Sequence, residues 1–306
     1  MKGKEGYLID ERTGNAQFPV TSFNCVKDPQ RGITLTEWSD GVEDDLESHG
    51  ETLGQLANNT DGKTIVVFGD SIIQRDLWYP TRFRATGIPF KNFYVYGCGA
   101  ASLANDSGTI NGYDESRDFG GAIWNQVQKF WHEYTEGNLE QPDVFLIDGG
   151  ANDGNSPIGN VETVFDYSNK VMDFTTKQLH EDFNAGDSVW WSVMGGIRCM
   201  VSFLQVKFPD ALIILATPLP RVFRYDSENT MTAVSGMRSV ADAIIVAGKW
   251  LGVDVIDKWE GCGLNPDWDY QSSYYLSDGV HPNSVGGTAI AKFMAARIRE
   301  LVRWRL

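Results

Sequence analysis

A serine in Gly69-Asp70-Ser71 is the first residue whose type and position suit covalent chemistry. It directly follows the apolar run Thr64–Phe68 and precedes a predicted helix that contains Arg75 and Trp78. A serine at the carboxyl end of a parallel strand lies at the sheet edge where ligands bind, and its N–H and the helix N-terminus can stabilise an oxyanion. Gly-Asp-Ser is also a good turn and N-cap sequence, so this segment alone leaves both interpretations open.

A carboxylate and an imidazole lie three positions apart in Asp278-Gly279-Val280-His281, shortly before the last predicted helix. Pro282 favours an extended backbone at His281 and suits the start of a helix. In a tight turn this spacing lets Asp278 reach one ring nitrogen, which leaves the other to deprotonate a serine. The alternative is a turn cap beside a half-buried surface histidine. The other three histidines lack such a neighbour, so the pattern favours an acid–base pair.

Two glycine-containing segments supply candidate donors for a negatively charged oxygen. Asn152 lies in Gly149-Gly150-Ala151-Asn152-Asp153, straight after the apolar run Val144–Ile147, and its amide can donate to an oxyanion. The segment is equally typical of an Asn-Asp-Gly turn. Gly97-Cys98-Gly99-Ala100 follows another apolar run and can present a backbone N–H to the same site.

Five short apolar runs are predicted to be the strands that position these segments: Thr64–Phe68, Phe93–Tyr96, Val144–Ile147, Leu212–Ala216 and Val253–Ile256. Runs that are apolar almost throughout are typical of parallel strands covered on both faces, and longer amphipathic stretches separate them. We therefore predict an α/β fold for residues 63–306, a three-layer α/β/α sandwich around a five-stranded, mainly parallel sheet.

Two stretches with apolar residues near helical spacing are predicted to be helices whose apolar faces belong to the core. The first lies between Met231 and Leu251 and the second near the C-terminus. Their apolar residues are Val234, Met237, Ala241, Ile244, Ile245 and Trp250 in the first, and Ile290, Phe293, Ile298 and Leu301 in the second.

Residues 1–62 are polar, acidic and interrupted by glycine, and we predict a small N-terminal appendage or tether. The stripe Leu35, Trp38, Val42 and Leu46 suggests a short amphipathic helix that packs on the main domain or on a second copy, giving a homo-oligomer. Residues 7–21 resemble the openings of some tail-associated phage proteins. The start lacks the pattern of a secretory signal, and we expect a mature secreted form or a virion protein rather than a cytoplasmic one.

Composition excludes several classes of function. The formal net charge of −15 would repel phosphate backbones, which argues against DNA or RNA as a partner. No apolar run approaches the ~20 residues that span a bilayer, so we expect no membrane segment. The four cysteines are widely separated, without zinc-ligand spacing, and free buried thiols are expected, although an extracellular disulfide stays open. We predict neither a metal nor an organic cofactor.

These segments resemble, in order and in strand-end placement, the blocks of the GDSL/SGNH hydrolase family from Lys63 to near the C-terminus. Gly-x-Ser-x-Gly is absent because Ile73 takes its last position, which argues against an α/β-hydrolase elbow. The resemblance implies an SGNH/flavodoxin-like sheet, with Ser71 as nucleophile and Asp278 and His281 as acid and base. It implies Ser71, Gly99 and Asn152 as oxyanion donors. The glycine block departs most from the family pattern, which leaves Gly99 or Ala100 as the donor.

The reaction implied by the resemblance is serine esterase chemistry, two-step acyl transfer without a cofactor. The polar-aromatic stretch 265–275 suits sugar stacking better than a fatty chain, so we predict a small ester or an acylated glycan, in particular an acetylated one, as substrate. Trp268, Tyr274 and Arg221 are the candidate substrate-binding residues. Two alternatives remain, a lipase or other acyl-ester hydrolase, and a non-catalytic module that retains the fold.

Overall fold

The computed structural model describes residues 60–105, 113, 120–168, 170–180, 189–220, 223–225, 231–233, 237–264 and 274–306. Residues 1–59, with the apolar stripe near Trp38 and the phage-like segment, lie outside this part. The appendage and the oligomer that it would support therefore stay predictions.

Five parallel strands form the central sheet in the order β2-β1-β3-β6-β9. This confirms the predicted α/β fold. The strands are β1 Thr64–Gly69, β2 Asn92–Gly97, β3 Val144–Asp148, β6 Leu212–Ala216 and β9 Asp254–Ile256. At the end of β1, Gly69 pairs in register with Gly97 on one side and Asp148 on the other, so three of the candidate segments leave the sheet side by side.

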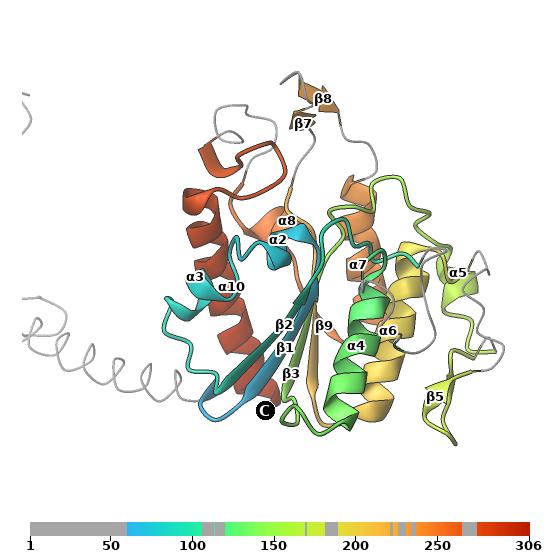
Figure 1. The fold of residues 1–306 in the computed structure, drawn as a ribbon. Helices are drawn as coiled ribbons and strands as arrows, with labels where there is room; N and C mark the ends of the chain where they lie inside the picture. The colour runs from blue at the N-terminus through green and yellow to red at the C-terminus, as the bar shows by residue number, and fades with distance from the viewer. Residues whose placement is uncertain are drawn as a thin grey trace, which may run out of the picture. The chain divides into compact units, whose positions relative to one another are not determined.

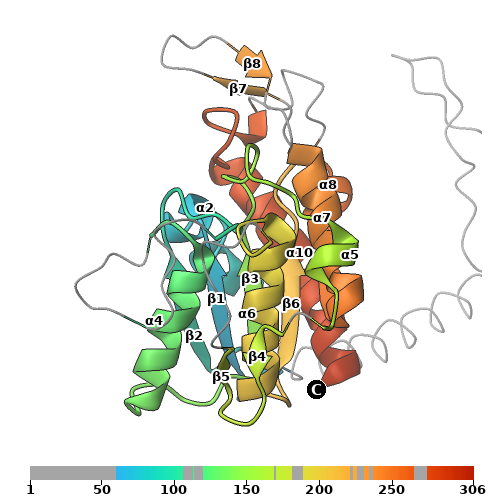
Figure 2. The same cartoon turned by 90° about the vertical axis from the view of Figure 1, so that its right-hand side faces the viewer.

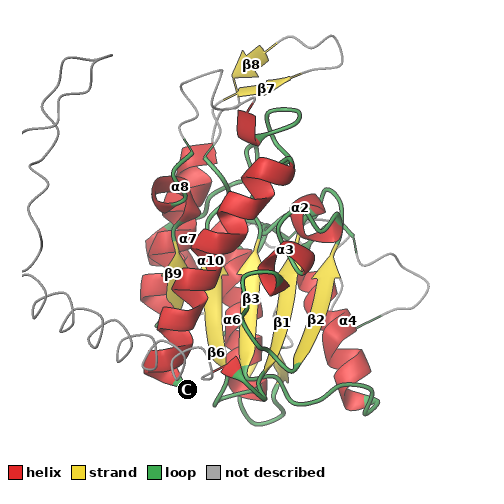
Figure 3. Cartoon of the chain, turned by 90° about the vertical axis from the view of Figure 1, so that its left-hand side faces the viewer, coloured by secondary structure: helices red, strands yellow, loops and turns green. Residues whose placement is uncertain are grey.

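Helices cover both faces of this sheet (Figure 1). The first face is covered by α4 (Ile123–Thr135), α6 (Val193–Lys207) and α7 (Met237–Leu251) (Figure 2). The second is covered by α10 (Ser284–Arg305) and α3 (Thr81–Arg84) (Figure 3). Successive side chains of a strand point to opposite faces, so Val66 and Phe68 of β1 join the first core, and Ile65 and Val67 join the second.

Short elements connect these layers. Three are single helical turns and four form two antiparallel pairs, β4 with β5 and β7 with β8. Their bounds are α2 Ser71–Gln74, α5 Val161–Val164, α8 Lys258–Gly261, β4 Met172–Asp173, β5 Gln178–Leu179, β7 Phe223–Tyr225 and β8 Met231–Ala233. In all three ribbon views α2 lies at the carboxyl edge of the sheet, and the β7–β8 pair lies beyond the same edge (Figures 1, 2 and 3).

Two helix predictions are wrong in extent. The helix after Ser71 ends at Gln74, short of Arg75 and Trp78, because Asp76 adopts a φ of 51° and its carboxylate accepts the Thr81 N–H at 2.9 Å. Aspartate tolerates that left-handed conformation better than most residues.

The second wrong prediction concerns α7. The helix begins at Met237, because Met231–Ala233 pair with β7 instead. Trp250 at its end is 47% exposed, so it is not the core residue that its spacing indicated. Its ring stacks on Phe165 at 5.6 Å between centroids, at the rim of the first core.

Candidate active site

Ser71 lies where β1 turns into α2, and its surroundings are tightly closed. A side chain at Gly69 would put its Cβ 2.6 Å from the Asp148 carbonyl oxygen, so only glycine fits at the end of this strand. Asp70 caps α2, because its carboxylate accepts the Ile72 N–H at 2.9 Å. Ser71 itself keeps 9% of its surface exposed.

The structure brings Ser71, His281 and Asp278 together across 210 positions of sequence. Ser71 Oγ lies 2.8 Å from His281 Nε2, and His281 Nδ1 lies 2.7 Å from Asp278 Oδ2. An ionised Asp278 accepts the proton of Nδ1, which leaves Nε2 as the acceptor for the Ser71 hydroxyl. This hydrogen-bonded relay is the arrangement that activates a serine nucleophile.

The turn from Asp278 to His281 holds the carboxylate as well as the ring. Asp278 Oδ1 accepts the N–H groups of Val280 at 3.0 Å and of His281 at 2.7 Å. Burial alone would raise the pKa of Asp278, but these N–H groups and the His281 ring outweigh it and hold the pKa below its usual value. The carboxylate therefore stays ionised at neutral pH, as an orienting acid requires.

The N-terminus of α10 anchors the loop that carries His281. Asn283 caps the helix by accepting the N–H groups of Val285 and Gly286. A Cβ at Gly286 would lie 2.2 Å from the Tyr275 carbonyl oxygen, and one at Gly287 would lie 1.9 Å from that of Leu77. Gly286 therefore allows the helix to approach the segment before Asp278, and Gly287 allows it to approach the chain just after α2, which brings His281 within reach of Ser71.

The predicted oxyanion donors lie on the two neighbouring strand ends. The Asn152 amide donates to the Ala101 carbonyl at 2.9 Å, which ties the loop after β3 to the loop after β2. Ala101 N–H bonds back to Cys98 at 3.2 Å, so Gly99 and Ala100 form the middle of a turn in which Ala100 has a φ of 61°. Both Gly99 and Ala100 remain candidates for the donor.

Asp153 holds the loop after β2 in place through backbone N–H groups. It is fully buried, and its carboxylate accepts the N–H groups of Leu103 at 2.8 Å and Ala104 at 2.9 Å. Burial raises the pKa of Asp153 despite these two hydrogen bonds. The aspartate that follows Asn152 is therefore a brace for the loop after β2.

Gln126 of α4 is a supporting residue that the sequence analysis missed. Its fully buried amide accepts the Gly69 N–H at 2.9 Å and donates to the Gly69 carbonyl at 2.7 Å, so it holds both sides of one residue next to the nucleophile segment. The signal was present, because Gln126 is a polar residue between Ile123 and Val127 on the buried side of an amphipathic helix. Buried amides of this kind need partners.

The cap residue Asp70 should make stability depend on pH. Burial, partly opposed by the Ile72 N–H and reinforced by Asp148, raises the pKa of Asp70 from 3.8 to about 6. A raised folded-state pKa contributes stability that is fully present below pH 3.8 and is lost as the pH rises to about 6. An asparagine at this position would keep the cap without this loss. Urea unfolding should thus show Asp70→Asn gaining about 3 kcal/mol relative to wild type across this window. If the unfolding free energies of wild type and Asp70→Asn changed in parallel with pH, the raised pKa of Asp70 would be contradicted.

The predicted substrate-binding residues are only partly visible. Trp268 and Arg221 lie outside the described residues, so their roles stay predictions. Tyr274 is 48% exposed and packs edge-on against Tyr275, with 5.0 Å between ring centroids. Asn283 donates to the Tyr274 carbonyl at 2.7 Å, which holds this tyrosine beside the His281 loop.

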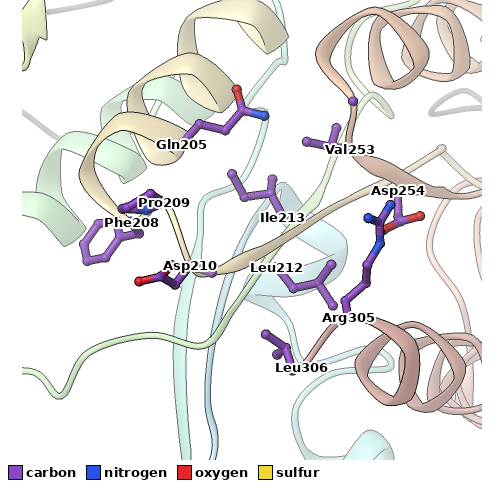
Figure 4. Close-up of a pocket in the computed structure, with 12 residues that line it drawn as sticks. Gln205, Phe208, Pro209, Asp210, Leu212, Ile213, Val253, Asp254, Arg305 and Leu306 are labelled. Carbon is purple, nitrogen blue, oxygen red and sulfur yellow. The ribbon is translucent and has the colours of Figure 1, made fainter. Parts of the chain in front are cut away.

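A pocket of 240 Å³ lies at the opposite edge of the sheet (Figure 4). It is lined by the chain around Leu212 and Asp254, where β6 and β9 begin, and by Arg305 at the end of α10. Arg305 and Asp254 form an ion pair at 3.3 Å within this lining. The pocket therefore belongs to the edge remote from Ser71.

Three further observations concern the cysteines, metal binding and membrane-spanning helices. Cys199 and Cys262 are free thiols, and Cys25 lies outside the described residues. Within the described ranges, no group of histidine, cysteine and carboxylate side chains has the arrangement of a metal site. None of the helices that the structure describes is both long and apolar enough to cross a bilayer.

Comparisons with known proteins identify the family of this chain. The model of the GDSL-like Lipase/Acylhydrolase family matches residues 67–289, which include the Ser71 and His281 segments. The chain is 30% identical to a GDSL esterase/lipase of Arabidopsis thaliana over 113 residues, 34% of this chain and 46% of that protein. The match thus spans less than half of the relative's length.

Solved structures show the same fold. A protein from Lactobacillus plantarum aligns with a TM-score of 0.54 and 15% identity, over 78% of this chain and 98% of that one. A second structure aligns with a TM-score of 0.54 and 17% identity, over 79% and 99%. None of these matches supports a phage origin.

The family match covers well over half of the chain, and its residues include every strand of the sheet except the first part of β1. Fold, strand-end serine and the block order lead to one family of hydrolases. This chain belongs to the GDSL-like lipase/acylhydrolase family.

Proposed function

We propose that the protein is a serine esterase in which Ser71 is the nucleophile, His281 the general base and Asp278 the orienting acid. One observation carries the proposal, the relay in which Ser71 Oγ lies 2.8 Å from His281 Nε2 while Nδ1 lies 2.7 Å from Asp278. Both distances allow hydrogen bonds without rearrangement, so proton transfer can accompany attack.

The reaction has two steps. Ser71 Oγ attacks the ester carbonyl while His281 Nε2 takes the hydroxyl proton, and His281 then donates that proton to the departing alcohol. Water attacks the acyl-serine with His281 again as base, which releases the acid and restores Ser71. Asp278 stays ionised throughout and stabilises the imidazolium.

The oxyanion of each tetrahedral intermediate is held, in this proposal, by the Ser71 N–H, by the Asn152 amide and by a backbone N–H of Gly99 or Ala100. Asn152 has two amide protons, and its bond to Ala101 uses one of them to orient the other. Ser71, Gly99 and Asn152 follow three adjacent strands, so their donors converge on one edge of the sheet.

For the substrate we propose a short acyl ester, in particular an O-acetyl group, on a carbohydrate. The exposed ring of Tyr274 beside the His281 loop suits a sugar face. In the described part of the chain, the strongly exposed large apolar side chains are aromatic except Val285 and Leu306. A long acyl chain would need a continuous aliphatic groove, since each buried methylene contributes about 0.8 kcal/mol.

A hydrolysis panel tests activity and substrate together. We expect the wild type to hydrolyse p-nitrophenyl acetate with a higher kcat/KM than the octanoyl and palmitoyl esters, and to release acetate from acetylated polysaccharide. The Ser71→Ala protein is the control, and it should do neither. A kcat/KM that rises to octanoyl or beyond, without acetate release, would replace the carbohydrate substrate by a lipid one.

A separate labelling experiment distinguishes an enzyme from a module that only retains the fold. A fluorophosphonate should add covalently to Ser71 at neutral pH, and intact-mass spectrometry detects the adduct. An equal adduct on folded Ser71→Ala, or none on the wild type, would contradict the nucleophile and favour the non-catalytic alternative.

A further inference from the structure

A buried ion pair lies at the strand end next to Gly69, close to the nucleophile segment, and the reaction proposed above does not use it. Asp148, the last residue of β3, accepts a hydrogen bond from the Lys258 ammonium group at Oδ1 and from the Trp78 indole at Oδ2, 3.1 Å away. The side chains of Lys258 and Asp148 are 1% and 5% exposed, and Trp78 is fully buried. Each oxygen of the carboxylate therefore has a partner from a different part of the chain.

Stability is a weak reason for such a pair. Removing two charges from water costs several kcal/mol per ion, and well-packed apolar residues are often equally stable in the same place. The pair does provide direction, because an ammonium and an indole N–H at opposite oxygens leave the carboxylate one orientation. We therefore expect the pair to contribute by orienting the segments that it connects.

The segment that carries Lys258 is held firmly. Lys258 begins α8 directly after β9, and its neighbour Asp257 accepts the Thr217 hydroxyl at 3.0 Å while that hydroxyl accepts the Trp259 N–H. The end of β9 is thereby fixed to the end of β6. The ammonium group of Lys258 reaches Asp148 on β3, although β6 lies between β3 and β9 in the sheet.

Asp148 lies between the two halves of the candidate site. Trp78 follows α2, the turn that begins with Ser71, whereas the residues directly after Asp148 lead to Asn152. Gly69 packs closely against Asp148, because the two residues pair in register and a Cβ at Gly69 would lie 2.6 Å from the Asp148 carbonyl oxygen. A shift of Asp148 must therefore move both segments.

We propose that Lys258 and Asp148 are positioning residues that hold the Ser71 turn and the Asn152 loop in register for acyl transfer. This inference rests on the proposed function. Neither residue touches the reacting atoms, and both act through the backbone segments that they connect. The positive charge of Lys258 also offsets a second buried carboxylate, that of Asp70, which lies in the same region.

A double replacement separates positioning from charge balance. Lys258→Met alone leaves a buried carboxylate unpaired, and we expect a large fall in Tm and in kcat. Lys258→Met with Asp148→Asn removes both charges and keeps an oxygen for the Trp78 indole, so Tm should return toward wild type. With register lost, kcat on p-nitrophenyl acetate should stay about 100-fold low, since small displacements of reacting groups have effects of this size. KM should change little.

Two further variants complete the experiment. Trp78→Phe keeps an aromatic ring at this buried position but removes the indole donor, and we expect a fall in kcat of about 10-fold, less than the effect of a full displacement, with KM unchanged. Arg238→Gln is the matched control, because Arg238 forms an exposed ion pair with Glu260 of the same α8 at 2.7 Å. It should leave kcat and Tm at wild-type values.

The possible results separate a positioning role from a purely structural ion pair. A double variant with recovered Tm and recovered kcat would show a structural ion pair only and would overturn the positioning role, as would a folded Trp78→Phe protein with wild-type kcat. The Trp78→Phe result decides the matter if the double variant does not fold. A wild type that hydrolyses no ester overturns the proposed function, and this inference with it.

Discussion

Replacing His281 with alanine is expected to lower kcat for a soluble ester by about 10⁴-fold or more, because nucleophile, base and acid act as one unit. Without the imidazole, Ser71 has no acceptor at 2.8 Å for its hydroxyl proton. The side chain of His281 is only 17% exposed, but it lies on a loop that backbone bonds hold, such as Ser277 N–H to the His281 carbonyl at 2.8 Å. The fold should therefore survive, and the loss should appear in kcat rather than in Tm.

Asp278→Asn and His132→Ala set the scale of this result. Asp278→Asn keeps an oxygen for the turn but loses the charge that stabilises the imidazolium, so its loss should be smaller than that of His281→Ala. His132, a partly buried histidine of α4, serves as the control and should have wild-type kcat when replaced. A folded His281→Ala protein with near-normal kcat would mean that the base lies elsewhere.

Asn152→Ala is expected to reduce kcat by about 10²- to 10³-fold, the usual effect of removing one oxyanion donor. The loss should leave KM almost unchanged, because the amide interacts more strongly with the developing oxyanion than with the ester carbonyl. Steady-state kinetics on p-nitrophenyl acetate measure both constants. Within the part of the chain that the structure describes, the substitution removes one side-chain hydrogen bond, that to Ala101, so the variant should remain folded.

Asn155 provides the matched control for this prediction, because it is an exposed asparagine in the same loop. Asn155→Ala should leave both constants unchanged. A rise in KM with unchanged kcat in Asn152→Ala would show that the amide binds the ground state and is no oxyanion donor. Equal losses in both variants would point instead to a disturbed loop.

Much of the architecture follows from the sequence alone. Five apolar runs predict five strands because a strand covered on both faces must be apolar at every position, and the observed bounds agree to within two residues. The three-residue spacing of Asp278 and His281 is local, so a turn suffices to bring the carboxylate to the ring, as the distance of 2.7 Å shows. The catalytic roles of these residues and of Ser71 stay predictions.

Tertiary structure alone decided which polar residues support the nucleophile. Gln126 and Lys258 are far from Ser71 in sequence, and no local pattern states that one holds Gly69 or that the other reaches Asp148. Likewise, the length of α2 depends on the conformation of Asp76. The exposure of Trp250 depends on where α7 meets the rim of the core. Periodicity reports which face of an element is apolar, because burial repeats along the chain. The partner of a buried polar group is set by strand order and loop approach, which arise only when distant segments pack together.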